Sequence, residues 1–102
     1  MSMHFPDLIR SLPVLDGPFD AFKLESDNFK VLFASYPAGT DISAHQHDTE
    51  NVGIVTRGCL QLITEGETRR FESGDWYHLD AQQQHAAKFD QDTQIIEFWF
   101  ER

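Results

Sequence analysis

The sequence predicts an all-β domain that follows a short helical or extended N-terminal segment over residues 1–18. Beyond Gly17, short runs of β-branched and aromatic residues alternate with Gly, Asp, Asn and Pro, which is typical of many-stranded antiparallel domains. No helical segment is long enough for a strand-helix-strand crossover, and no repeat of the solenoid kind is present. The length of 102 residues therefore favours one sandwich or barrel domain spanning residues 1–102.

Residues 5–12 are predicted to form one short helix. Pro6 suits a first helical turn, Asp7 complements the positive end of the helix dipole, and Pro13 ends the helix. We expect the apolar face of this helix to pack against the main fold.

Eight or nine strands are expected after this segment, separated by turns. The candidates lie near residues 19–24, 29–36, 42–47, 51–56, 59–64, 68–71, 76–79, 85–89 and 94–100. Arg57-Gly58 and Glu65-Gly66 each lie between two apolar runs, where a positive φ would match the twist of a hairpin. Both pairs are predicted to be hairpin turns.

The last strand presents two sets of side chains on opposite faces. Ile96, Phe98 and Phe100 share one face and are expected to line the barrel, which leaves Glu97 and Trp99 on the other face. An exposed aromatic ring such as Trp99 on a long apolar strand promotes aggregation unless another chain covers it. We therefore expect a homodimer.

Charge and composition exclude several classes of partner. Eight Lys and Arg residues against seventeen Asp and Glu residues give a formal charge of −9, which repels nucleic acid and anionic membranes. No apolar run approaches the roughly 18 to 20 residues that cross a bilayer. The lone Cys59 forms no intrachain disulfide, and the first residues lack the basic start and apolar stretch of a secretory signal. We expect a cytoplasmic protein.

The histidines suggest a metal site. His45 and His47 are two residues apart, so in an extended strand both rings lie on one face and can converge on an ion. The same parity places Asn51 on that face and points Glu50 away. A loop or bulge after His47 would reverse this count, so Glu50 stays an alternative ligand. His85 begins a later strand and offers a third imidazole that could meet the first two.

The spacing of these residues resembles the first motif of the cupin superfamily. That motif is a Gly, five residues, HxH, three or four residues, Glu, six residues and a Gly. Gly39, His45, His47 and Gly58 match it in register, and Asn51 stands at the position of the Glu.

The second cupin motif is a Gly, five residues, Pro, one residue, Gly, two residues and a His. Gly74 and His85 match it, while Asp80 and Gln82 replace its Pro and second Gly. The resemblance covers roughly residues 30–100, and the short interval between the motifs looks like that of small single-domain cupins of the conserved-barrel type.

The resemblance implies a double-stranded β-helix, or jelly-roll barrel, that holds one divalent metal ion with His45, His47, His85 and Asn51. Some small cupins carry Gln in place of the Glu, and an amide oxygen can also bind a metal. Three neutral imidazoles suit Fe²⁺, Zn²⁺, Ni²⁺, Mn²⁺, Co²⁺ or Cu²⁺.

Two functions follow as hypotheses. The first is a dioxygenase, isomerase or lyase acting on a small polar or anionic metabolite, because an amide ligand leaves the charge of the ion uncompensated and favours an enolate or carboxylate substrate. No general base is identified from the sequence. The alternative is a cupin that binds or senses a small molecule without turning it over.

Overall fold

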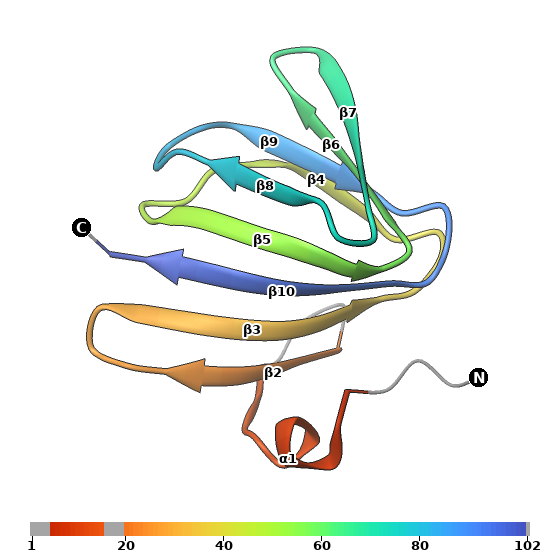
Figure 1. Cartoon of the computed structure of the whole chain (residues 1–102). Helices are drawn as coiled ribbons and strands as arrows, with labels where there is room; N and C mark the ends of the chain where they lie inside the picture. The colour runs from red at the N-terminus through yellow and green to blue at the C-terminus, as the bar shows by residue number, and fades with distance from the viewer. Residues whose placement is uncertain (1–4, 16–19, 102) are drawn as a thin grey trace.

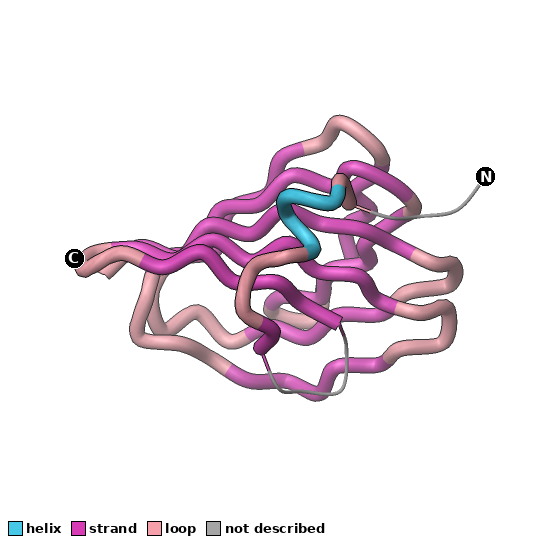
Figure 2. Tube along the Cα trace, turned by 90° about the horizontal axis from the view of Figure 1, so that it is seen from below, coloured by secondary structure: helices cyan, strands magenta, loops and turns pink. Residues whose placement is uncertain are grey.

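The computed structural model describes residues 5–15 and 20–101, and it consists mainly of two antiparallel β-sheets that face each other (Figure 1). One sheet has six strands in the order β1-β2-β3-β10-β5-β8, and the other has four in the order β4-β9-β6-β7. The predicted all-β jelly-roll fold with a short N-terminal helix is confirmed. Figure 2 shows this short helix beside the strands.

The elements follow one another closely along the chain. Their bounds are α1 (Asp7–Arg10), β1 (Val14–Leu15), β2 (Asp20–Glu25), β3 (Phe29–Tyr36), β4 (Asp41–His45), β5 (Glu50–Arg57), β6 (Cys59–Thr64), β7 (Glu67–Glu72), β8 (Trp76–Leu79), β9 (His85–Lys88) and β10 (Thr93–Phe100). β3, β6 and β8 have the predicted bounds, and the other predicted strands differ by one or two residues at their ends. The short β1 was not predicted, and the predicted start of β2 at Phe19 lies outside the described residues.

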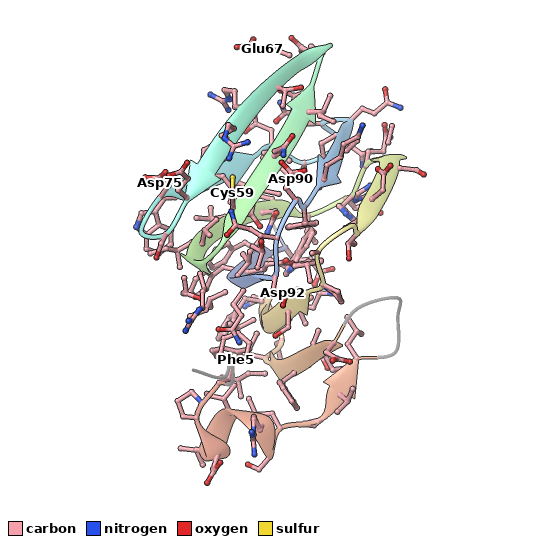
Figure 3. The ribbon with its side chains drawn as sticks, turned by 90° about the vertical axis from the view of Figure 1, so that its right-hand side faces the viewer. Phe5, Cys59, Glu67, Asp75, Asp90 and Asp92 are labelled. Carbon is pink, nitrogen blue, oxygen red and sulfur yellow. The ribbon has the colours of Figure 1, made fainter. Side chains whose placement is uncertain are left out.

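The N-terminal helix is shorter than predicted, and the contact with the main fold comes from the residue that precedes Pro6. None of the four residues of α1 is buried, and Leu8 is 80% exposed. A single helical turn is too short to present a continuous apolar face to a sheet. Phe5, just before the helix, makes the contact instead: its ring meets that of Phe33 edge-on at 5.8 Å between centroids. Phe5 lies low in Figure 3, on the side of the first strands.

One of the two predicted hairpin turns is confirmed. Glu65 and Gly66 have φ of 49° and 77° and join β6 to β7, as a two-residue turn with two left-handed residues requires. The prediction for Arg57-Gly58 is wrong, because β5 and β6 belong to different sheets. Gly58, with φ of 85°, is where the chain crosses from one sheet to the other.

The space between the sheets is filled by the hydrophobic core. Ala34, Val55 and Ile95 from the six-stranded sheet lie in one buried cluster with Leu60 and Leu62 from the four-stranded sheet. This packing leaves an open end of the barrel for the histidines, at the start of β9 and the end of β4.

The predicted faces of β10 are reversed in the structure. Ile95 and Glu97 are buried at 1% and 5% exposure, whereas Phe100 is 39% exposed. In the ladder Glu97 pairs with Leu32 of β3 and with Gly53 of β5, which places its side chain on the inner face. The alternation could not reveal this, because both faces of the strand carry large apolar residues.

Among the described residues, no helix has the length and apolar character needed to cross a membrane. The helix within residues 5–15 and 20–101 is α1, which has four residues.

We predict that Gly58→Ala destabilises the protein more than Gly66→Ala does. Both glycines have positive φ, so alanine costs roughly 1–2 kcal/mol at either site. A Cβ at Gly58 would also lie 2.5 Å from the carbonyl oxygen of Asp92, whereas one at Gly66 meets nothing within 4 Å. Urea denaturation should show an additional loss of about 2 kcal/mol for Gly58→Ala. Equal losses in the two variants would show that the crossing tolerates a side chain.

Candidate metal centre

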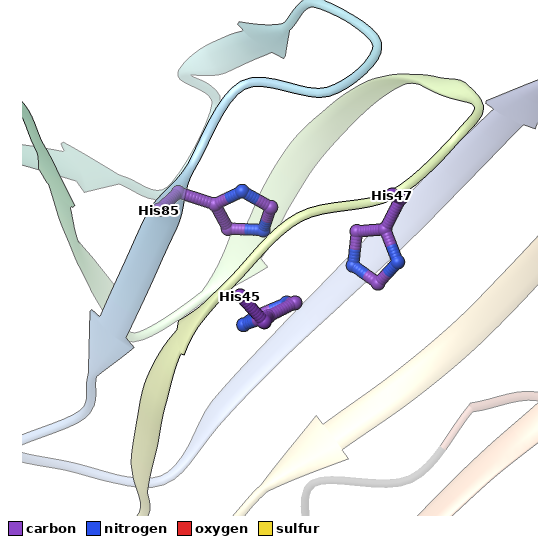
Figure 4. Close-up of side chains that lie close together, drawn as sticks. All are labelled: His45, His47 and His85. Atoms are coloured by element: carbon purple, nitrogen blue, oxygen red, sulfur yellow. The ribbon is translucent and has the colours of Figure 1, made fainter.

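Three imidazole rings meet at one end of the barrel. His45 is the last residue of β4, His85 is the first residue of β9, and the two pair directly across the antiparallel ladder. His47 follows in the loop after β4. The ring centroids are 4.6 Å apart for His45 and His47, 4.2 Å for His45 and His85, and 5.4 Å for His47 and His85. Figure 4 shows the rings turned toward a common space.

The geometry of this cluster suits a metal ion. One ring nitrogen from each histidine lies within 4.8 Å of the corresponding nitrogens of the other two. Because β4 ends at His45, the regular parity of an extended strand does not carry His47 to this position. The loop after β4 does so instead, and the structure still brings together the three histidines that the sequence singled out.

Backbone carbonyl groups orient two of the three rings. Nδ1 of His45 lies 2.8 Å from the carbonyl oxygen of Ser43, and Nδ1 of His85 lies 3.0 Å from that of Gln83. A carbonyl oxygen only accepts hydrogen bonds, so each Nδ1 carries the proton and each Nε2 presents a lone pair. This is the arrangement that holds a histidine ready for a metal ion.

Electrostatics favours the neutral, metal-binding form of the imidazoles. Burial lowers the pKa of His47, and the neighbouring rings of His45 and His85 lower it further. Burial also lowers the pKa of His85, against the opposing effect of the Gln83 carbonyl. The lowered pKa values of His47 and His85 favour their neutral forms, which are the forms that bind a metal ion.

A contact between loops holds His47 close to His85. The backbone N–H of Gln82 donates to the carbonyl oxygen of His47 at 2.6 Å. Gln82 has φ of 66°, which is a left-handed conformation. The second cupin motif has a Gly at this position, and Gly adopts that conformation without strain. The side chain of Gln82 accepts a hydrogen bond from Gln46 at 2.9 Å and donates one to Asp48. The two motif loops are thereby joined through one residue.

Asn51 and Glu50 lie in different surroundings. Asn51 is 3% exposed, lines the same cavity as the histidines, and donates from Nδ2 to the carbonyl oxygen of Phe98 at 3.1 Å. Glu50 hydrogen-bonds Nε2 of His78, and with Asp80 these residues form a second group of potential ligands. His78 and Asp80 are largely exposed, so this second group belongs to the protein surface.

A cavity of about 270 Å³ extends from the histidines into the space between the sheets. This volume lies near the lower end of the range for small-molecule sites, roughly 300–1,000 Å³. Leu, Ile and Phe side chains are eight of its nineteen lining residues. The polar and aromatic residues that line it besides the histidines and Asn51 include Lys30, Tyr36, Tyr77, Glu97 and Trp99.

Glu97 is the functional candidate that the sequence analysis missed. Its carboxylate accepts a hydrogen bond from the Tyr36 hydroxyl. Burial raises the pKa of Glu97 to about 7, although Tyr36, the Trp99 indole and Lys30 act in the opposite direction. The buried indole N–H of Trp99 is near this carboxyl group but makes no well-aligned hydrogen bond. A carboxyl group with this pKa exchanges protons near neutral pH, as a general acid or base does.

One signal in the sequence pointed to Glu97. It is the only charged residue in β10, an otherwise apolar and amide-containing strand. A charge in the middle of such a strand lies either on a solvated face or in a polar site inside the fold, and the sequence alone favoured the first. Tyr36 and Tyr77 line the same cavity. Their pKa values are raised well above the usual range, chiefly by burial, so both hydroxyl groups stay protonated.

Comparison with known families identifies the fold. The model of the cupin domain family matches residues 32–100. The chain therefore belongs to the cupin family. No match was found among curated proteins.

Three solved structures illustrate the likeness. An RmlC-like cupin from Shewanella frigidimarina NCIMB 400 has a TM-score of 0.82 and 17% identity, over 99% of this chain and 93% of that one. KdgF from Halomonas sp. has a TM-score of 0.76 and 21% identity, over 91% and 92%. The DMSP lyase DddQ from Ruegeria pomeroyi DSS-3 has a TM-score of 0.73 and 24% identity, over 81% of this chain and 47% of that one. At these identities the comparisons show a shared fold.

Stability should depend on pH through Glu97. The pKa of Glu97 is about 7 in the folded protein and 4.5 is its ordinary value, so the folded state binds the proton more tightly. The contribution of Glu97 to stability is therefore greatest below pH 4.5, falls as the pH rises to 7, and is constant above that. The predicted change is about 3 kcal/mol.

Glu97→Gln, which keeps a polar partner for Tyr36, should abolish this fall. The measurement is the free energy of unfolding of both proteins between pH 4.5 and 8, taken as a difference so that contributions from the histidines cancel. Glu67→Gln removes an exposed carboxylate on β7 and serves as the control. Parallel stability curves for wild type and Glu97→Gln would contradict the prediction.

Proposed function

We propose that this cupin is a metal-dependent enzyme acting on a small polar or anionic metabolite, with one divalent transition metal ion held by His45, His47 and His85. The observation that carries the proposal is the convergence of three imidazoles, two of them oriented by backbone carbonyl groups, at the mouth of a cavity that also contains the protonatable carboxyl group of Glu97. Structural metal sites close their coordination with protein ligands, whereas catalytic sites leave a position open.

The donor set supports Fe, Zn, Ni, Mn, Co or Cu as the ion. Asn51 is the proposed fourth ligand, because it lines the cavity with the histidines while Glu50 contacts His78. When bound, the ion supplies Lewis-acid stabilisation to an oxygen atom of the substrate. The residues of the chain orient the ligand, exclude water through the apolar walls, and hold a proton on the Glu97 carboxyl group.

Glu97 favours isomerase or lyase chemistry over dioxygenase chemistry. Isomerisation and elimination both move a proton from or to carbon, and a buried carboxyl group with a pKa of about 7 can accept and return it at neutral pH. The Tyr36 hydroxyl, which donates to the carboxylate, fixes the orientation of that group. A dioxygenase would instead need an oxygen-binding position, for which no residue of the cavity provides a separate argument.

Metal binding is predicted to require the three histidines. Purified wild-type protein should contain or take up one divalent ion per chain, and Ala at His45, His47 or His85 should weaken Zn²⁺ binding by at least about 100-fold. The measurements are elemental analysis and competition against a chromophoric chelator. His78→Ala removes an exposed imidazole outside this cluster and should leave the affinity unchanged.

The same titration tests the fourth ligand. Asn51→Ala should weaken Zn²⁺ binding by about 10-fold if the amide oxygen is a ligand, and Glu50→Gln should have no effect. Equal Zn²⁺ affinity in wild type and in the variant with all three histidines replaced would refute the proposed metal centre.

Catalysis is predicted to involve proton exchange with solvent. Metal-loaded protein should exchange a carbon-bound hydrogen of small hydroxy or oxo acids in D₂O, as followed by NMR, and Glu97→Gln should slow this exchange by about 100-fold or more without loss of metal. Measurement of oxygen consumption with diketones, thiols and phenols as substrates tests the dioxygenase hypothesis in parallel. Tight binding without turnover of any compound would favour the alternative, a non-catalytic binding or sensor cupin.

We also propose a cytoplasmic homodimer. The outer face of the six-stranded sheet exposes Trp76, Phe29 and Phe100 at 57%, 43% and 39%. These exposed rings are the argument for the dimer. Trp99 is not, because its ring lies inside the cavity against His47, at 4.7 Å between centroids. Molar mass from light scattering decides the assembly. The cytoplasmic location rests on Cys59, a buried free thiol.

A further inference from the structure

One positive charge faces the cavity of this acidic protein. Lys30 is the only Lys or Arg among the described residues that line the cavity. It lies on β3 and pairs with Trp99 of β10 in the ladder. The chain has a formal charge of −9, so a cation that lines its cavity opposes the field of the protein as a whole.

Lys30 and the histidine cluster flank the same indole ring. Nζ of Lys30 lies 5.8 Å from the centroid of Trp99, and the ring of His47 meets Trp99 edge-on at 4.7 Å between centroids. Lys30 and Trp99 belong to the six-stranded sheet, while His45 and His85 belong to the four-stranded sheet. A ligand that spans the mouth of the cavity would therefore touch both sheets.

The ammonium group of Lys30 is available to a ligand. Ion pairs within 4 Å join other residues of the described chain, such as Lys23 with Glu25 and Arg70 with Asp90, and none involves Lys30. Lys30 lines the cavity, and its Nζ lies over the ring of Trp99, which lines the same cavity. A lysine that served only to neutralise Glu97 would lie in direct contact with that carboxylate.

The cavity walls define the rest of the ligand. Leu32, Leu60, Leu62 and Ile95 line the space, so the body of the ligand is apolar. The volume of about 270 Å³ restricts it to a small metabolite. Two polar ends are then required, one at the histidine cluster and one at Lys30.

We propose that Lys30 binds a carboxylate of the substrate, so that the enzyme acts on a short-chain organic acid with a carboxylate at Lys30 and an oxygen donor at the histidine cluster. This inference rests on the proposed function for the histidine end alone. The carboxylate end depends on Lys30 and Trp99, which belong to the protein whatever ion is bound.

The experiment compares dicarboxylates of three to six carbons with their monoamides, each titrated into the Zn²⁺-loaded protein by calorimetry. A monoamide keeps one carboxylate for the metal end but loses the charge at the other end. In the wild type the best dicarboxylate should bind about 10-fold more tightly than its monoamide. Lys30→Met should reduce this ratio to less than about twofold, and Lys30→Arg should retain most of it.

Lys88→Met is the matched control, because it removes one positive charge from an exposed position on β9 and should keep the full ratio. A Trp76→Phe background makes Trp99 the only indole, so quenching of its fluorescence reports where the ligand binds. Unchanged Zn²⁺ affinity in Lys30→Met shows that the variant is folded.

Two results would overturn the inference: an equal ratio in wild type and Lys30→Met, or no binding of any dicarboxylate at about 10 mM. Absence of Zn²⁺ binding by the wild type would instead refute the proposed metal centre. The same dicarboxylate titrations on the metal-free protein would then still test Lys30.

Discussion

The antiparallel pairing of β4 with β9 is the constraint on which the proposed metal centre depends. It sets His45 directly opposite His85, although the two residues are far apart in the sequence. Because β4 ends at His45, the chain is free to turn there and to bring His47 to the same point. The strands fix two rings and the loop supplies the third, so a change that separated β4 from β9 would dismantle the donor set as a whole.

Burial disfavours the charged forms of Glu97, His47 and His85 in the cavity. It raises the pKa of Glu97 and lowers those of His47 and His85, so every one of these groups is driven toward its neutral form. In the proposed metal centre, neutral imidazoles would offer their lone pairs to the ion without a competing proton. The positive Lys30 remains as an exception, and its charge suits a negative ligand better than a metal ion.

The sequence predicted the strands well wherever turn residues bounded an apolar run. β3, β6 and β8 have the predicted bounds, and the three histidines meet as the two motifs implied. The prediction failed where the alternation of apolar and polar residues does not distinguish the two faces of a strand. Both faces of β10 are apolar, so only the ladder with β3 and β5 shows that Glu97 and Trp99 lie inside. Gly58 looked like a hairpin residue because a crossing between sheets also needs a positive φ.

The left-handed conformation of Gln82 has a consequence for how the site opens. A non-glycine residue is held there by bonds to His47, Gln46 and Asp48, all in the neighbouring loop. The two loops are therefore coupled through Gln82. Loss of these hydrogen bonds would release both its left-handed backbone and the restraint on His47. In the proposed metal centre, exchange of the ion would then need only a local opening at these loops, while the sheets beneath keep their pairing.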